Sequence, residues 1–94
     1  MLAHKFLVHH VGDSVGVAIE DINAEEEIQG VYLEDDSIIT TVSKDFIPLG
    51  HKIALVDISK DDFVIEYKEK IGIATKQIEQ GNYVHTHNLK TARW

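Results

Sequence analysis

The chain has 94 residues, of which 44% are hydrophobic and 27% charged, with a net charge of −7 and no cysteine. This length and composition predict one globular domain over residues 1–94, and the lack of cysteine excludes disulfides, thiolate metal sites and a cysteine nucleophile. The sequence has neither a signal-peptide pattern nor an apolar run of the roughly 20 residues that span a membrane, so we expect a cytoplasmic location and no membrane partner.

Acidic residues are concentrated in the first half of the chain. Residues 1–50 carry ten acidic and two basic side chains, a balance of −8, whereas residues 51–94 carry six acidic and seven basic ones, a balance of +1. This distribution has no basic footprint, so we expect no nucleic-acid partner. The acidic runs at 25–27 and 34–36 lack the spacing of a calcium-binding EF-hand loop and are predicted to be solvated turns.

Short runs rich in β-branched and aromatic residues predict, in chain order, strands at 5–10, 14–19, 31–33, 37–43, 51–58, 63–67, 70–75 and 82–89. Phe63, Ile65 and Tyr67 are expected to share one face of their strand. Residues 21–30 are predicted to be a loop or one helical turn, and no segment has a convincing helical period. Neither a linker nor an internal repeat is apparent. Many short strands joined by turns are typical of an all-β domain, either a small barrel or a sandwich.

The segment GNYVHTHN (81–88) contains the most informative pair of the six histidines, His85 and His87. In a strand both imidazoles would point to the same face, beside Asn88. Neutral imidazoles bind metals and exchange protons near neutral pH, so the pair is a candidate catalytic or metal site. A zinc site needs at least three protein ligands, so a third would come from elsewhere in the fold or from another chain. Ordinary sheet histidines are the alternative interpretation.

The remaining histidines have weaker signals. His51 and Lys52 follow a turn and could bind a carboxylate substrate, or they could be exposed residues at a sheet edge. His4, His9 and His10 are predicted to be surface or hydrogen-bonded residues. Because His9 and His10 are adjacent, they would point to opposite faces of a strand and could not form a two-ligand site there.

Five segments carry a resemblance to a known family. They are KFLVHHVGDSVGVAIEDI (5–22), IPLGHKIALVDI (47–58), VIEY (64–67), IGIAT (71–75) and GNYVHTHNLKT (81–91). In this order they resemble the small domain of the altronate/galactarate dehydratase family, and the likeness covers nearly the whole chain. That domain is of the SAF type, so the resemblance implies an all-β fold, a compact β-clip barrel of short strands with tight turns.

The family resemblance also implies a function. In this family the small domain is fused to a large catalytic region or forms a separate subunit, and a chain that stops at Trp94 resembles the separate form. The resemblance therefore implies the small subunit of a lyase of the altronate/galactarate dehydratase type. Such a lyase removes water from a sugar acid or related 2-hydroxy acid by β-elimination. A large catalytic subunit is the implied partner, and a divalent metal, usually iron, is the implied cofactor of the complete enzyme.

Three alternatives stay open. The ending NLKTARW is similar to the small subunit of (2R)-sulfolactate sulfo-lyase, which removes bisulfite instead of water. A second alternative is a non-catalytic SAF domain with a binding or regulatory role, because a fold does not determine a function. The third is an autonomous metal-binding protein that uses His85 and His87.

The resemblance implies roles for individual residues in the lyase. His85 and His87 match the family's histidine motif and are expected to be catalytic, with metal binding as a further role. His51 and Lys52 belong to the LGHK block and are expected to bind a substrate carboxylate, while Asn88 would hydrogen-bond a substrate hydroxyl. Elimination beside a carboxylate needs a base for the proton and a cation or Lewis acid for the developing charge, which suits these residue types. The isolated chain is expected to be inactive.

Two turns depart from the family pattern. Asp61-Asp62 stands where the family often has Gly-Asp, and Tyr67-Lys68-Glu69 stands where it often has Tyr-Gly-Glu. Glycine adopts a positive φ angle without steric cost, so its loss predicts altered geometry at turns that need such an angle.

Overall fold

The computed structural model describes residues 4–91, and this part of the chain consists of short strands without a helix. The strands are β1 (His4–Val8), β2 (Val15–Ala18), β3 (Glu27–Tyr32), β4 (Ile38–Val42), β5 (Lys52–Ala54), β6 (Phe63–Glu66), β7 (Glu69–Ala74), β8 (Tyr83–Val84) and β9 (Leu89–Thr91). Within the described range, no helix is long and apolar enough to cross a membrane.

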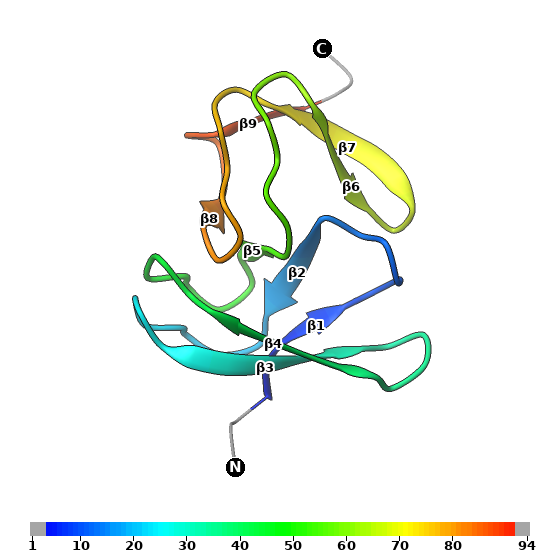
Figure 1. Cartoon of the computed structure of the whole chain (residues 1–94), viewed down its shortest axis with the longest axis vertical. Coiled ribbons are helices and arrows are strands. Elements are labelled where there is room, and N and C mark those ends of the chain that lie inside the picture. Colours follow the sequence, from blue (N-terminus) through cyan, green and yellow to red (C-terminus); the bar gives the residue numbers. More distant parts are fainter. Residues whose placement is uncertain (1–3, 92–94) are drawn as a thin grey trace.

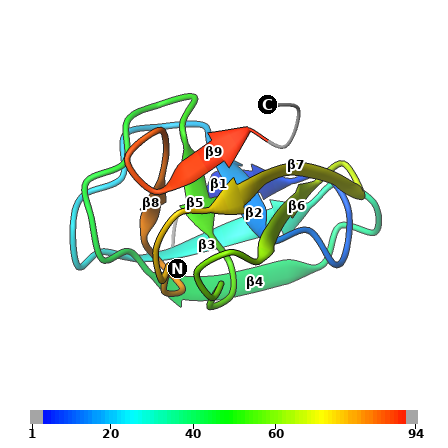
Figure 2. The same cartoon turned by 90° about the horizontal axis from the view of Figure 1, so that it is seen from above.

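The strands form two sheets, one above the other in the view of Figure 1. The larger sheet has the order β4-β3-β1-β2-β5-β8 and the smaller one the order β6-β7-β9. Neighbouring strands are antiparallel, except that β1 and β3 are parallel. The larger sheet curls instead of lying flat, as the view from above shows (Figure 2). A curled sheet of short strands is the architecture of a SAF-type β-clip barrel, so the predicted all-β fold class is confirmed.

The buried apolar side chains form two clusters. The first cluster comprises Phe6, Val8, Ala18, Ile22, Ile28, Ile47, Ile53 and Leu55. The second comprises Val15, Ala54, Ile58, Val64, Ala74, Ile78 and Val84. Ile53 belongs to the first cluster and its neighbour Ala54 to the second, because successive residues of a strand point to opposite faces. In β2, Val15 belongs to the second cluster and Ala18 to the first. The strands β2 and β5 therefore separate the two clusters and contribute side chains to both.

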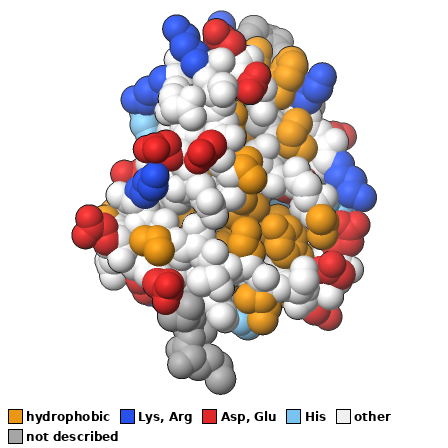
Figure 3. All heavy atoms as spheres, in the orientation of Figure 1, with side chains coloured by type: hydrophobic (Ala, Val, Ile, Leu, Met, Phe, Trp, Pro, Cys, Tyr) orange, Lys and Arg blue, Asp and Glu red, His pale blue; other side chains and the backbone are white. Residues whose placement is uncertain are grey.

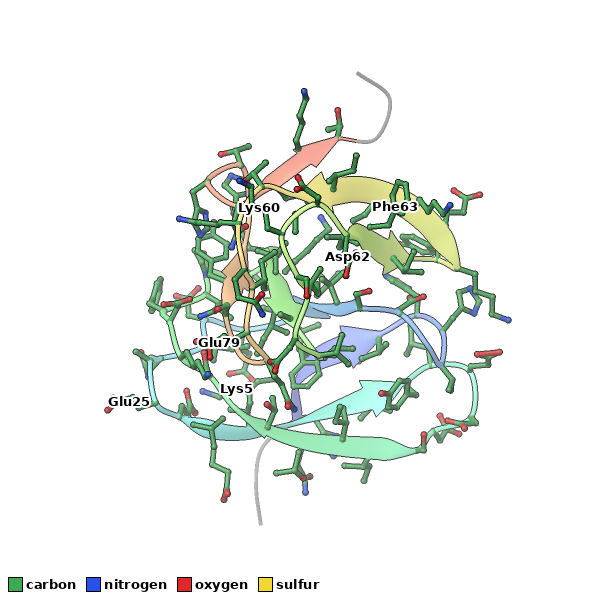
Figure 4. All side chains as sticks on the ribbon, turned by 45° about the horizontal axis from the view of Figure 1, so that its top comes forward. Lys5, Glu25, Lys60, Asp62, Phe63 and Glu79 are labelled. Carbon is green, nitrogen blue, oxygen red and sulfur yellow. The ribbon has the colours of Figure 1, made fainter. Side chains whose placement is uncertain are left out.

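Four turns have the same form, and they correct the expectation that the chain has no internal repeat. They span residues 21–28, 46–53, 57–64 and 77–84. In each, the second residue is a buried isoleucine and the eighth is a buried isoleucine or valine. The sixth residue donates its backbone N–H to the carbonyl of the third, at distances of 3.3, 3.0, 3.0 and 2.9 Å in chain order. Figure 4 labels Glu25, Lys60 and Glu79 on three of these repeated turns.

The fifth residue of each repeated turn has a left-handed backbone. The φ angles are 63° at Glu25, 87° at Gly50, 75° at Asp61 and 93° at Gly81. Glycine suits this conformation, whereas an L side chain there costs roughly 1–2 kcal/mol. The Asp61-Asp62 turn thus adopts a positive φ with Asp61 in this position, and it keeps the form of the two glycine turns instead of the altered geometry that loss of glycine predicted.

The repeated turns associate in pairs. Ile22 and Ile47 exchange two backbone hydrogen bonds of 2.9 and 2.8 Å, and Ile58 and Ile78 exchange two of 2.8 Å. In the first pair, the carboxylate of Asp21 accepts the N–H of Leu49 at 2.9 Å. The same bond recurs in the second pair, where Asp57 accepts the N–H of Gln80 at 2.8 Å. Each pair of turns closes one of the two apolar clusters.

The β6–β7 hairpin turn also has positive φ angles, 56° at Tyr67 and 61° at Lys68. The buried carboxylate of Asp13 accepts the N–H groups of both residues at 3.1 Å. The ring of His9 stacks on that of Tyr67, with 4.0 Å between centroids. These contacts hold a turn that would otherwise favour glycine.

Several predicted strand details are wrong. The predicted strand 82–89 ends at Val84, and residues 85–88 form a turn before β9. The predicted strand 51–58 keeps only its first part as β5, because the third repeated turn starts at residue 57. Residues 27–30, expected in a loop, begin β3. In β6 the buried residues are Val64 and Glu66, whereas Phe63 is 45% exposed and Ile65 half-buried, so the predicted apolar face is turned largely to solvent.

We predict that replacing Gly81 by alanine destabilises the protein more than the same change at Gly50. Both residues occupy the fifth position of a repeated turn, and both have a left-handed backbone. A Cβ at Gly81 would lie 2.3 Å from the carbonyl oxygen of Val42, whereas a Cβ at Gly50 would meet nothing within 4 Å.

Urea denaturation should therefore give a loss of about 1–2 kcal/mol in unfolding free energy for Gly50→Ala. For Gly81→Ala the loss should exceed about 3 kcal/mol, because the backbone itself has to move. Equal losses for the two variants would contradict the close approach at Gly81.

Candidate functional site

Three histidine rings surround one tyrosine, and we call His51, Tyr83, His85 and His87 the histidine cluster. Centroids lie 5.5 Å apart for His51 and Tyr83, 5.6 Å for Tyr83 and His85, and 5.4 Å for Tyr83 and His87. The rings of His51 and His85 are 4.9 Å apart. The structure thus brings together the three histidines that the sequence singled out.

Strand register explains why these side chains meet. Tyr83 in β8 pairs with Ile53 in β5, so the two side chains share a face of the sheet. Two residues along each chain, His51 and His85 lie on that same face. The prediction that His85 and His87 share one face of a strand is wrong, because both residues lie in the turn at 85–88, yet both rings reach Tyr83.

Tyr83 is the member of the cluster that sequence reasoning missed. Its hydroxyl oxygen lies 2.6 Å from Nδ1 of His51, a hydrogen bond between half-buried side chains. His85 and His87 are exposed. Tyr83 stands within the segment GNYVHTHN, but a single strand does not reveal its cross-strand neighbour, which is 32 residues away. The cluster offers a sheltered tyrosine–histidine pair and two exposed imidazoles, which suits proton exchange with a bound anion.

The backbone of Tyr83 is fixed from both sides. The carboxylate of Asp45 accepts the Tyr83 N–H at 2.8 Å and the side-chain amide of Asn82 at 3.2 Å. The amide of Asn88 donates to the Tyr83 carbonyl at 2.8 Å. Tyr83 is therefore held in place by side chains on both flanks as well as by its strand neighbour.

Asn88 shapes the turn that carries the exposed histidines. It is only 4% exposed, and its Oδ1 accepts the backbone N–H of His85 at 2.9 Å. The side-chain amide nitrogen donates to the Tyr83 carbonyl, so the oxygen and the nitrogen of the side chain are both bonded within the fold. β8 ends at Val84, where this turn begins. The expected hydrogen bond from Asn88 to a substrate hydroxyl stays a prediction, and the structure gives Asn88 a positioning role for His85.

Lys52 lies apart from the histidine cluster. It pairs with Val17 and Val84, so its side chain lies on the opposite face from Tyr83. Its Nζ is 4.0 Å from Oε1 of Glu66, a carboxylate that is only 5% exposed. The structure thus does not bring Lys52 and His51 together on one face, and it adds a buried carboxylate that the sequence pattern did not indicate.

The other histidines lie outside the cluster. His9 stacks on Tyr67, and Nδ1 of His10 is 3.6 Å from a carboxylate oxygen of Glu34. The backbone N–H of Val11 holds the pKa of the Glu34 carboxyl below its usual range. His4 is exposed in β1. His9 and His10 thus contact residues of other loops, and His4 lies at the surface, as the sequence predicted for residues without a role in the site.

The described side chains do not fit a complete metal centre. Within residues 4–91, no group of three or more His, Cys, Asp or Glu side chains is arranged to hold a metal ion. In addition, the Nδ1 atom of His51 is already bonded to Tyr83. A metal at the cluster would thus need ligands from another chain, as the count of histidines in the sequence also indicated.

A surface depression of about 360 Å³ lies away from the cluster. It is lined by Thr41, Val42, Lys44, Asp57, Glu79 and Gln80. Its polar groups bind one another: Lys44 pairs with Glu79 at 3.4 Å, and Gln80 donates to Thr41 at 3.2 Å. No member of the histidine cluster lines it, so we place the candidate site at the cluster, where the acid–base groups gather.

Comparison with known proteins provides a family context. Residues 4–92 match the family model described as the altronate/galactarate dehydratase SAF domain. The chain is 41% identical over 90 residues to the (2R)-sulfolactate sulfo-lyase subunit alpha of Chromohalobacter salexigens, covering 95% of this chain and 96% of that protein. It is 45% identical over 64 residues to the protein of the same name from Paracoccus pantotrophus, covering 68% and 96%.

A third relative is much longer. The chain is 38% identical over 89 residues to the altronate dehydratase of Bacillus subtilis, covering 93% of this chain but only 16% of that enzyme. Related sequences thus occur both as a protein of similar length that is named a subunit and as a small part of a longer enzyme.

We predict that Asn88→Ala destabilises the turn that carries His85 and His87. The substitution leaves the His85 N–H and the Tyr83 carbonyl without their partner, so the unfolding free energy should fall by about 1–3 kcal/mol. Exchange of the His85 amide hydrogen should also become faster. Thr86→Ala, an exposed change in the same turn, is the control and should stay within about 0.5 kcal/mol of the wild type. Unchanged stability and His85 protection in Asn88→Ala would contradict the positioning role.

Proposed function

Because the chain belongs to the SAF-domain family of the altronate/galactarate dehydratases, we propose that it is the small subunit of a heteromeric lyase that acts on a 2-hydroxy acid. The observation that carries this proposal is the match over 96% of the length of a protein named a sulfo-lyase subunit. The relatives are lyases or lyase subunits. They differ in the share of their own length that this chain covers.

Within that class, we propose (2R)-sulfolactate as the substrate ahead of altronate or galactarate. The two sulfo-lyase subunits are covered over 96% of their length, whereas the altronate dehydratase of Bacillus subtilis is covered over 16%. This reverses the order that the sequence resemblance favoured, in which the dehydratase came first and the sulfo-lyase was the alternative.

The proposed partner is a large catalytic subunit that covers the histidine cluster. Two of the cluster's imidazoles are exposed, and the described side chains do not complete a metal site. Large apolar side chains are also exposed, and many gather across the face seen in Figure 3. Those in the described range that are at least 41% exposed are Val11, Ile19, Leu33, Ile38, Val42, Phe46, Leu49, Val56, Phe63 and Tyr67. Exposed apolar surface of this extent suits contact with another protein.

The proposed chemistry assigns proton transfer to the exposed imidazoles. In a β-elimination, a base removes the proton on the carbon beside the carboxylate, and the leaving group departs from the next carbon with its bonding electrons. His85 and His87 are the proposed base and proton shuttle, since imidazole exchanges protons near neutral pH. The divalent metal that the family implies would supply a Lewis acid when bound, and we propose that the large subunit provides the ligands that this chain lacks.

Co-expression with a candidate large subunit from the same organism tests the subunit proposal. We expect a stable complex that releases bisulfite from (2R)-sulfolactate, while neither chain alone has activity. Altronate and galactarate, assayed in parallel, should react poorly or not at all. A stable complex without activity on any of the three acids would support the non-catalytic SAF domain, and activity of the small chain alone would contradict a subunit role.

Alanine substitution of the exposed histidines tests their proposed roles in the reconstituted enzyme. If His85 or His87 transfers the proton, its replacement should lower kcat/KM by roughly 10²–10⁴-fold, the usual contribution of general acid–base catalysis. His4→Ala changes an exposed histidine outside the cluster and should leave the activity unchanged. Full activity in both His85→Ala and His87→Ala would remove these residues from the site.

A further inference from the structure

We propose that Tyr83 is a positioning residue that holds neutral His51 with its proton on Nε2. His51 would then present a hydrogen-bond donor, and not a base, to an anionic group of the substrate. The substrate contact rests on the proposed lyase function, whereas the position of the proton does not.

The acid–base chemistry of the two groups identifies the donor of the bond between these side chains. Nδ1 of His51 and the hydroxyl oxygen of Tyr83 are 2.6 Å apart. A phenol hydroxyl is a stronger acid than the N–H of a neutral imidazole, and an imidazole nitrogen is a stronger base than a phenol oxygen, so the hydroxyl is the better donor and the ring nitrogen the better acceptor. The hydroxyl therefore donates and Nδ1 accepts. A neutral imidazole has one proton, so an accepting Nδ1 leaves that proton on Nε2.

The fold holds both partners rigidly. The backbone N–H of His51 donates to the Pro48 carbonyl at 3.0 Å, and the His51 carbonyl accepts the N–H of Ala18 at 2.8 Å. On the other side, Asp45 and Asn88 fix the backbone of Tyr83. Because His51 and Tyr83 belong to different repeated turns, their bond also joins the second turn to the fourth. An orienting partner of this kind sets which ring nitrogen carries the proton.

A proton on Nε2 of His51 implies different roles for His51 and for the other histidines of the cluster. An Nε2–H group can bind a carboxylate or sulfonate oxygen but cannot accept the proton that elimination removes. The base must then be His85, His87 or a group of the large subunit. The ring of His85 lies 4.9 Å from that of His51, so a donor and a candidate base stand side by side.

Nitrogen NMR of the isolated chain tests the proton position directly. Long-range ¹H–¹⁵N correlation spectra at about pH 8, where an ordinary imidazole is neutral, distinguish the two ring nitrogens. We expect an unprotonated Nδ1 and a protonated Nε2 for His51. Tyr83→Phe keeps the ring but removes the hydroxyl, so the preference should weaken. Tyr32→Phe, at another half-buried tyrosine, should leave the His51 signals unchanged. A protonated Nδ1 in the wild type would overturn the proposal.

Kinetics of the reconstituted lyase test the consequence for substrate. Loss of the orienting hydroxyl should raise KM by about 10- to 100-fold and leave kcat within about twofold, because the donor binds the ground state and the transition state alike. A fall in kcat with an unchanged KM would instead make His51 the base and overturn the assigned role. If the complex has no lyase activity, the proposed function fails, but the NMR result still decides the proton position.

Discussion

The backbone hydrogen bonds that join Ile22 to Ile47 and Ile58 to Ile78 constrain the rest of the structure. The strands contain only two to six residues, so each ladder has few hydrogen bonds with which to specify its own register. The paired turns supply the missing constraint. Each turn reverses the chain through a left-handed residue and buries an isoleucine at its start and an aliphatic residue at its end. Burying each such side chain contributes roughly 1.5–3 kcal/mol, so the turns are also part of the core.

The histidine cluster lies where the two pairs of turns meet. His51 belongs to the second turn, which pairs with the first, whereas Tyr83 belongs to the fourth, which pairs with the third. The short ladder between β5 and β8 joins the pairs and sets Tyr83 opposite Ile53. The residues with acid–base chemistry therefore depend on contacts between turns that are distant in the sequence. Asn88 then places His85 beside the same seam by binding the backbone on both sides of Val84.

Alternation of apolar residues was sufficient to predict the all-β class, and strands with a regular pattern, such as β7 at Glu69–Ala74, were found almost at their true bounds. The strand predicted at 82–89 failed because a side chain, that of Asn88, replaces the ladder there with a turn. The repeated turns could not be predicted from the sequence, because only two of their eight positions are apolar in all four turns. For the site, the sequence identified the histidines, but the role of Tyr83 depends on a contact over 32 residues and could not be predicted.

Two imidazoles of the cluster face solvent, and the side chains of residues 4–91 do not complete a set of metal ligands there. Such a site suits the family relationship, in which a subunit acts with a partner. The central claim is that the large subunit covers this cluster. Amide hydrogen exchange of the chain, measured alone and in the complex, tests it most directly. The account predicts that new protection is concentrated at residues 50–53 and 83–89. Protection confined to other surfaces, with the amides of His85 and His87 exchanging as fast as in the free chain, would contradict it.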